Sequence, residues 1–251
     1  MDALGRQAVL VDLLQRDGRV EVSAAAERFG TAEMTVRRDL DVLVARGIAR
    51  RVRGGAVSLL MRGEEMPFSM RAVDAADEKR RIGLATAELV QDGESVLLDS
   101  GTTALEVARA LKGRRLTVMP LSLHAAMVLS GQDSVRLLMP GGETRPGELA
   151  LVGPLALAGI SAVRFDTAVL SCCGLADGQV TAHDLGDAAA KQAMLSVAAR
   201  VILVADASKF GRTAMAAVCG TERIDVVITG TGAPGETISA MASRGVEVHR
   251  A

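Results

Sequence analysis

Two arginines stand side by side in the stretch TAEMTVRRDL, residues 31–40. The spacing of Val36, Leu40 and Leu43 predicts a helix that turns these three apolar side chains inward. Arg38 then points away from the core, and Arg37 lies on a flank. Arginine can donate two hydrogen bonds to guanine in the DNA major groove, where a helix-turn-helix protein inserts the N-terminal half of such a helix. The candidate DNA-binding side chains of this helix are Glu33, Met34, Thr35, Arg37 and Arg38.

The charge around this pair favours the same chemistry. Residues 31–57 contain six arginines against three acids. The segment IARRVRGGAV, residues 48–57, alternates apolar and basic residues before a Gly-Gly pair, which is typical of a small β-wing. Its arginines would contact phosphates or the minor groove. The alternative is a surface arginine pair that is either solvated or paired with nearby acids, of which Asp39 and Asp41 are close in the sequence. The wing candidates are Arg50, Arg51 and Arg53.

A second signal is LLDSGTT, residues 97–103, where a predicted strand ends and a helix follows. The hydroxyl groups of Ser100, Thr102 and Thr103 would converge with the first backbone N–H groups of that helix. The helix dipole adds partial positive charge at the same point. This arrangement suits a phosphate group. The alternative is that the hydroxyl groups only cap the helix.

The segment ADASKFG, residues 205–211, also follows a predicted strand. It would therefore lie at the same carboxyl edge of the sheet, where open α/β folds bind ligands. Lys209 could neutralise a phosphate, and Asp206 could accept hydrogen bonds from sugar hydroxyl groups. The alternative is a solvated loop lysine.

Other residues with possible chemistry give weaker signals. Asp187 and Lys191 are four apart in HDLGDAAAK, a spacing that can also be an ordinary helix pair contributing ~0.2–0.5 kcal/mol. The three histidines are too scattered for a metal site, and the three cysteines lack CxxC spacing. We expect neither a metal nor a cofactor.

The elements that must position these residues fall into two parts. Residues 1–57 predict three short helices followed by the wing, and residues 58–73 predict a connector without clean periodicity. From residue 74 to residue 251, short apolar strands alternate with helices, which predicts an α/β domain with a mostly parallel sheet. The predicted helices span residues 4–16, 22–29 and 33–46, and the predicted strands span residues 95–99, 116–120, 135–140, 165–173, 200–206, 225–229 and 246–250.

The composition limits the function classes. The 251 residues carry 30 acids and 29 basic residues, a net charge of −1, which excludes a globally basic nucleic-acid binder but not a local basic patch. Tryptophan and tyrosine are absent, so aromatic stacking on unpaired bases is a poor expectation. No apolar run is long enough to span a bilayer, and the first residues do not resemble a signal peptide. The cysteine usage indicates a reducing, cytoplasmic compartment.

A family resemblance covers nearly the whole chain. The run EMTVRRDL and the closing R-x-x-GGA segment resemble the N-terminal domain of the DeoR family of bacterial transcription regulators. The resemblance continues in EKRRIG, LLDSGTTALEVARAL, PGGETRPGELALVGP and ADASKFGRTA.

The resemblance implies a winged helix-turn-helix domain and a sensor domain similar in fold to ribose-5-phosphate isomerase and CoA-transferase-like proteins. It implies a repressor of carbohydrate-metabolism genes that binds double-stranded operator DNA as a homodimer or homotetramer and responds to a phosphorylated sugar or related metabolite. The effector-site residues that it implies are Asp99, Ser100, Gly101, Thr102, Thr103, Asp206 and Lys209, with Gly141, Gly142, Asp187 and Lys191 as weaker candidates.

Two departures from the family pattern bear on these expectations. Ala32 stands where relatives often carry a Ser or Thr helix cap, so the cap either shifts to Thr31 or weakens by about 1 kcal/mol. Pro120 and Leu121 replace a polar pair that many relatives carry near the pocket, which leaves the ligand class open.

Two other function classes remain as alternatives. A sugar-phosphate isomerase or hydrolase could use Asp99, Asp206 and Lys209 as acid–base groups, but such an enzyme has no use for a DNA-binding domain. A DNA-binding oligomer whose second domain has lost its ligand is the other alternative. We expect a regulator without enzymatic activity.

Overall fold

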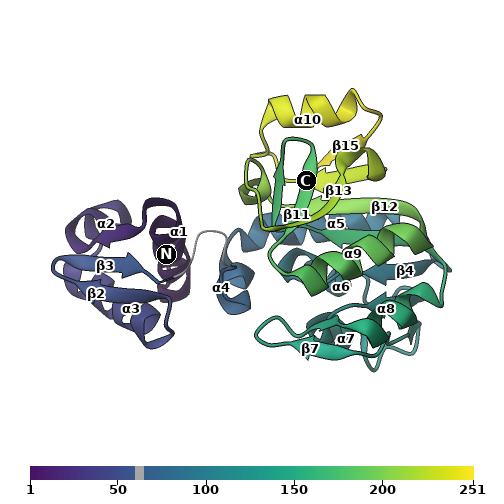
Figure 1. The fold of residues 1–251 in the computed structure, drawn as a ribbon, viewed down its shortest axis with the longest axis horizontal. Coiled ribbons are helices and arrows are strands. Elements are labelled where there is room, and N and C mark those ends of the chain that lie inside the picture. The colour runs from purple at the N-terminus through teal and green to yellow at the C-terminus, as the bar shows by residue number, and fades with distance from the viewer. Residues whose placement is uncertain (60–64) are drawn as a thin grey trace. The chain divides into compact units, whose positions relative to one another are not determined.

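The computed structural model describes residues 1–59 and 65–251, which form two compact units, residues 1–74 and residues 75–251 (Figure 1). Within this described part of the chain, no helix is long and apolar enough to cross a membrane.

The first unit is a winged helix-turn-helix. Its core contains the predicted inner-face residues Val36, Leu40 and Leu43, which are buried with Leu10 and Leu14. The three strands form an antiparallel sheet in the order β1-β3-β2, and the hairpin β2-β3 is the wing that the basic alternation predicts. The elements are α1 (Ala3–Asp17), β1 (Arg19–Glu21), α2 (Val22–Phe29), α3 (Glu33–Ala45), β2 (Ala49–Val52) and β3 (Gly55–Ser58).

A glycine is required where the wing meets β1. A Cβ atom on Gly55 would lie 1.9 Å from the carbonyl oxygen of Val20. The backbones of β1 and β3 therefore pack at a distance that no larger residue permits.

The connector predicted for residues 58–73 differs from the structure. Residues 60–64 lie outside the described residues, but α4 (Phe68–Val73) is a short helix. Met66 and Met70 are buried in the core of the first unit, and α4 packs against α1. Apolar contact with α1 orders this segment although its own sequence has no clear period.

The second unit is built on a seven-stranded sheet in the order β15-β14-β12-β9-β4-β5-β6, in which every neighbouring pair is parallel (Figure 1). All seven predicted strands are present, and the prediction of a mostly parallel sheet is confirmed. The strands are β4 (Ser95–Leu98), β5 (Leu116–Pro120), β6 (Val135–Leu137), β9 (Phe165–Ser171), β12 (Ala198–Ala205), β14 (Val226–Thr229) and β15 (Glu247–Arg250).

Helices cover both faces of this sheet. On β4, Val96 and Leu98 belong to the core cluster that includes residues of α5, α6 and α7, whereas Leu97 belongs to the other cluster, which includes residues of α8, α9 and α10. This alternation follows the two-residue period of a strand and explains why the strands are continuously apolar. The helices are α5 (Ala76–Leu89), α6 (Thr102–Ala110), α7 (Leu123–Leu129), α8 (Pro154–Ser161), α9 (Leu185–Val197) and α10 (Gly235–Ala242).

Smaller antiparallel pieces, which the sequence did not predict, complete the second unit. A three-stranded sheet has the order β10-β11-β13, and β7 pairs with β8 in a hairpin. Two short 3-10 helices, Ala207–Lys209 and Thr221–Arg223, lie in loops. The added strands are β7 (Glu143–Arg145), β8 (Ala150–Val152), β10 (Gly174–Ala176), β11 (Gln179–Ala182) and β13 (Ala216–Gly220).

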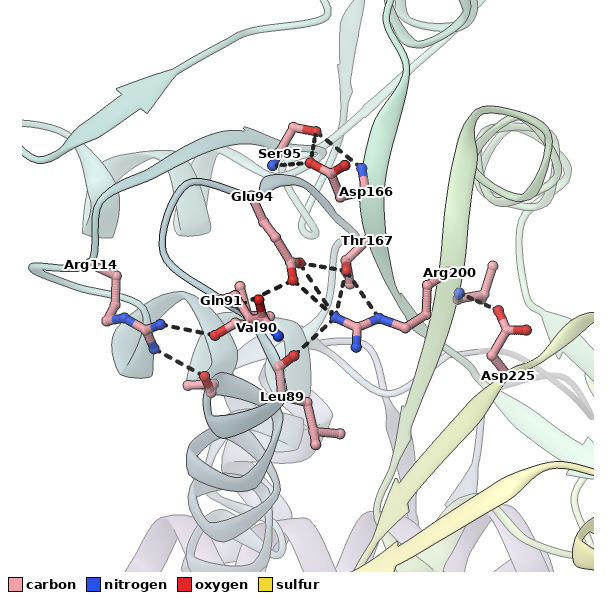
Figure 2. Close-up of polar contacts among 12 residues, drawn as sticks. Leu89, Val90, Gln91, Glu94, Ser95, Arg114, Asp166, Thr167, Arg200 and Asp225 are labelled. Atoms are coloured by element: carbon pink, nitrogen blue, oxygen red, sulfur yellow. Dashed lines mark hydrogen bonds and ion pairs between the residues drawn. The ribbon is translucent and has the colours of Figure 1, made fainter.

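The amino edge of the large sheet is fixed by side chains (Figure 2). Thr167 donates to Glu94 at 2.7 Å and accepts from Arg200, which also donates to the carbonyl oxygen of Leu89 at 2.9 Å. Asp166 accepts hydrogen bonds from the backbone N–H and the hydroxyl group of Ser95, and these bonds lower the pKa of its carboxyl group.

The neighbouring strand is fixed in the same manner, since Asp225 accepts from the backbone N–H of Val201 at 2.7 Å (Figure 2). These contacts hold the strand starts together and leave the opposite, carboxyl edge for other groups.

Candidate functional sites

Helix α3 begins without a side-chain cap. Its N-cap residue is Ala32, and neither Ala32 nor Thr31 accepts a helix N–H through its side chain. The first turn closes through the Ala32 carbonyl oxygen, which accepts from the N–H of Thr35 at 2.9 Å. Of the two outcomes expected for Ala32, the cap is therefore the weakened one and does not shift to Thr31.

The outer face of α3 is exposed as its periodicity predicts. Met34 is 55% exposed, Arg37 and Arg38 are exposed, and Thr35 is partly buried. Arg37 forms an ion pair with Glu33 one turn earlier at 2.8 Å. The outer face thus presents one paired arginine and, at Arg38, one arginine that has no hydrogen bond or ion pair within the described residues.

Asp39 and Asp41, the acids that follow the two arginines, pair with other residues. Asp39 is buried and accepts from Arg6 at 2.8 Å and from Gln7 at 3.2 Å, both on α1. Asp41 forms an ion pair with Arg51 of the wing at 3.1 Å. Asp39 and Asp41 therefore pair with other residues, whereas Arg37 pairs with Glu33 and Arg38 is exposed to solvent.

The wing presents its arginines unequally. Arg51 is held by Asp41 and donates to the carbonyl oxygen of Gly55 at 3.4 Å. Arg50 and Arg53 are exposed, and Arg53 lies in the two-residue turn between β2 and β3. Arg50 and Arg53 leave their guanidinium groups to solvent, while Arg51 also braces the wing against α3.

In the second unit, the phosphate-loop candidate lies at the carboxyl end of β4. Ser100, Thr102 and Thr103 are buried, and α6 begins after Gly101, whose φ of 95° is in the region that favours glycine. No side chain caps α6. The alternative in which these hydroxyl groups serve as helix caps is therefore wrong, and the first N–H groups of α6 have no side-chain acceptor.

Asp99, the residue before this loop, accepts hydrogen bonds through both of its carboxylate oxygens. Its Oδ2 atom accepts from the backbone N–H and from the hydroxyl group of Ser171, each at 2.8 Å, and from the ammonium group of Lys191. Its Oδ1 atom accepts from the N–H of Ser100 at 2.8 Å. The carboxylate is buried and points into the protein.

Lys191 and Asp187 are not an ordinary surface pair, because both are buried and each contacts other elements. Burial opposes the charge of Lys191, but the carboxylates of Asp99 and Asp187 outweigh burial and raise the pKa of the amine. Asp187 accepts weakly from the hydroxyl group of Ser100 at 3.5 Å and lies 3.6 Å from the guanidinium group of Arg145.

The second loop lies at the carboxyl end of β12. Asp206 has no exposed surface, and its Oδ1 atom accepts from the backbone N–H and the hydroxyl group of Ser208. Its Oδ2 atom lies 3.9 Å from Nζ of Lys79 and 4.0 Å from Nζ of Lys209. Burial opposes the charge, but the two lysines and Ser208 lower the pKa of this carboxyl group.

Gly141 and Gly142 are exposed and precede the hairpin β7-β8. A Cβ atom on Gly142 would lie 2.5 Å from the carbonyl oxygen of Val152, so close backbone packing in the hairpin accounts for this glycine. The residue of this segment that reaches the other candidates is Arg145, through Asp187.

The structure brings the two loops toward the end of β9. Cys172, whose thiol is buried, directly follows β9, and β9 pairs with β4 on one side and with β12 on the other. Burial is the largest effect and raises the pKa of that thiol to about 12. Leu121, one of the two departures, is buried in the apolar core beside Met119. Among the described residues there is no group of histidines, cysteines and acids that could hold a metal ion.

Sequence reasoning missed three residues that contact the candidate residues: Ser171 contacts Asp99, Lys79 contacts Asp206 and Arg145 contacts Asp187. Ser171 ends β9 beside the strand β4, where the order of the sheet reverses, and this switch point is the signal that could have found it. Lys79 lies in the run EKRRIG and Arg145 in the run PGGETRPGE, and only the burial of Lys79 and the partial burial of Arg145 distinguish them from surface charges.

Two family models and one solved structure are similar to this chain. A family model described as a DeoR-like helix-turn-helix domain matches residues 6–60, and one described as the DeoR C terminal sensor domain matches residues 74–231. A ribose 5-phosphate isomerase A structure from Methanocaldococcus jannaschii has a TM-score of 0.41 and 17% identity over 54% of this chain and 55% of that one.

Relatives match the chain over most of its length. The transcriptional repressor AccR of Agrobacterium fabrum is 34% identical over 90% of this chain and 89% of its own. The glycerol-3-phosphate regulon repressor of Escherichia coli is 29% identical over 95% of both chains. The chain therefore belongs to the DeoR family of transcriptional regulators.

Proposed function

We propose that this regulator represses carbohydrate-metabolism genes and that a phosphorylated sugar or related metabolite controls its affinity for operator DNA. Two relatives support repression by their names, a transcriptional repressor and a repressor of a glycerol-3-phosphate regulon. The unpaired Arg38 on the exposed face of α3 supports DNA binding through that helix.

The observation that carries the effector proposal is the difference between the two lysines at the carboxyl edge, Lys191 and Lys209, in their contacts with carboxylates. Lys191 forms a close ion pair with Asp99. Lys209 makes a weaker contact, since its Nζ atom comes no closer to Asp206 than 4.0 Å, and 16% of its side chain is exposed. The start of α6 supplies backbone N–H groups without a side-chain cap. A phosphate would accept hydrogen bonds from these N–H groups and pair with Lys209.

In this proposal, residues 1–57 bind the operator, and residues 74–251 sense the effector and form a homodimer or homotetramer. Residues 58–73 join these two parts, and their helix α4 packs against α1. Two copies of α3 would then occupy successive major grooves of an inverted repeat. Since the regulator works on DNA, we propose a cytoplasmic location. The effector acts by binding one arrangement of the protein more tightly than the other.

The isomerase alternative is less well supported. Asp99 already accepts hydrogen bonds from Ser171, Ser100 and Lys191, so its carboxylate is not available as a general base. We therefore propose that the sensor unit binds a sugar phosphate without turning it over.

The test is operator binding with and without phosphorylated sugars. The full chain is titrated onto DNA from upstream of its own gene, alone and with ribose 5-phosphate, fructose 6-phosphate, glucose 6-phosphate or glycerol 3-phosphate. Release by one of these compounds, without its consumption, supports a sensor-repressor. Conversion of ribose 5-phosphate would instead favour the enzyme, and DNA binding that none of them alters would contradict the effector proposal.

A further inference from the structure

The first turn of α5 contacts the loop that carries Lys209. Glu78 accepts a hydrogen bond from the backbone N–H of Ala207 at 2.8 Å, and Lys79 lies 3.9 Å from Asp206. The side chain of Glu78 also crosses Gly230, where a Cβ atom would lie 2.0 Å from its Oε1 atom. Two consecutive residues of α5 thus bind the same short loop, and a glycine makes room for one of them.

Asp206 lies between two lysines and is fully bound by neither. Its Oδ2 atom is buried and makes no hydrogen bond within the described residues, although Lys79 and Lys209 each approach to about 4 Å. Lys79 is 1% exposed and comes from α5, whereas the side chain of Lys209 is partly exposed. A negative ligand that attracts Lys209 would leave Lys79 as the remaining cation for this carboxylate.

Helix α5 is also the element through which the chain enters the second unit. The first unit ends at Asp74 and the second begins at Ala75. Ala75 has a φ of 50°, in the left-handed region that non-glycine residues rarely adopt, and Lys79 donates its N–H to the carbonyl oxygen of Ala75 at 3.0 Å. Lys79 therefore lies one helical turn after the boundary between the two units, and a movement of Lys79 would occur close to that boundary.

We infer that Lys79 and Glu78 are positioning residues that couple the effector site to the DNA-binding unit. This inference rests on the proposed function, because it assigns a route for the signal from that same site. The effector draws Lys209 away from Asp206, Asp206 then binds Lys79 more closely, and the first turn of α5 shifts at the unit boundary. This shift changes the direction of the backbone at residues 74 and 75, where the first unit joins the second.

The experiment separates effector binding from its transmission. Lys79→Met removes the ammonium group and keeps a long apolar chain, and Glu78→Gln weakens the acceptor for Ala207. Arg80→Met is the matched control, because Arg80 is exposed on the same turn and has no hydrogen bond or ion pair within the described residues. Binding of ribose 5-phosphate, glycerol 3-phosphate and inorganic phosphate is measured by calorimetry, and operator affinity is measured with and without each compound.

In the wild type and in Arg80→Met, a probe that binds should lower operator affinity by roughly tenfold or more. Lys79→Met and Glu78→Gln should bind that probe within about threefold of the wild type but lose most of its effect on the operator. Circular dichroism checks that each variant is folded, and Lys79→Arg should restore part of the response.

Two results would overturn the inference alone. One is an undiminished operator response in both Lys79→Met and Glu78→Gln. The other is loss of probe binding in the folded variants, which would make these residues part of the binding site rather than of its coupling. If the wild type binds operator but none of the probes, the proposed function fails as well, and the wild-type data show this directly.

Discussion

Arg6 on α1 donates a hydrogen bond to the carboxylate of Asp39 on α3 at 2.8 Å. Because Asp39 pairs with Arg6, it does not pair with its neighbour Arg38. The same contact joins α3 to α1. One partly buried ion pair therefore both anchors α3 and leaves Arg38 without a competing partner among the described residues.

Arg38→Ala should weaken operator binding by about 1–3 kcal/mol and relax base preference at one position of the operator. The reason is the loss of two directed hydrogen bonds to a base edge. Fluorescence anisotropy on a set of operators with single base changes measures both effects. Arg46→Ala is the control, since Arg46 is an exposed residue at the opposite end of α3. An unchanged sequence profile in Arg38→Ala would remove Arg38 from base recognition.

Ala32→Ser should stabilise α3 by about 1 kcal/mol, because serine supplies the missing acceptor for the first turn. Native-state hydrogen exchange of the α3 amides measures this change, and it suits a chain that lacks tryptophan and tyrosine. Ala32→Gly, which adds no side-chain acceptor, separates a backbone effect from a capping bond. Equal protection in the serine and glycine variants would show that no side-chain cap forms.

Asp206→Asn should lower the free energy of unfolding near neutral pH, because it leaves Lys79 and Lys209 without their carboxylate. The pKa of Asp206 is lowered in the folded protein, so its stabilising effect is present above its unfolded pKa of about 3.9 and is lost as pH falls through the folded value. Denaturation curves of wild type and variant should therefore converge below about pH 4.

The exposed Asp133→Asn serves as the control for this pH dependence. A difference between wild type and Asp206→Asn that stays constant from neutral to strongly acidic pH would contradict a charged Asp206 in the folded protein.

Cys172 should resist alkylation in the native protein, because burial raises the pKa of its thiol to about 12 and a thiolate is the reactive form. Treatment with iodoacetamide near pH 8, followed by mass spectrometry, should label Cys172 far more slowly than the same residue after unfolding. Cys219, whose thiol pKa is raised to about 11, gives an internal comparison. Rapid labelling of native Cys172 would show that the end of β9 opens in solution.

Local periodicity predicted α1, α2 and α3 of the first unit and all seven strands of the large sheet. The small sheet β10-β11-β13 was missed because its strands are short and β13 joins from a distant part of the chain. The connector prediction failed at Met66 and Met70 for a similar reason, since their order comes from packing against α1 and not from their own sequence.

The sequence predicted the candidate residues that directly follow a strand. It did not predict which charged side chains form ion pairs with one another. The sequence placed Asp99 and Asp206 at the carboxyl edge, but it suggested Asp187 as the partner of Lys191. In the structure Lys191 binds Asp99, 92 positions earlier in the chain. Spacing along a helix cannot reveal such a partner, because only the parallel sheet brings β4 beside β9 and α9.

The fixed amino edge of the large sheet has an evolutionary consequence. Glu94, Thr167 and Arg200 hold the strand starts together without any contribution from the loops at the other end. Substitutions such as Pro120 and Leu121 can therefore accumulate at the carboxyl edge while the strands keep their register. Residue changes in the carboxyl-edge loops of a duplicated copy of this chain would therefore leave the scaffold intact.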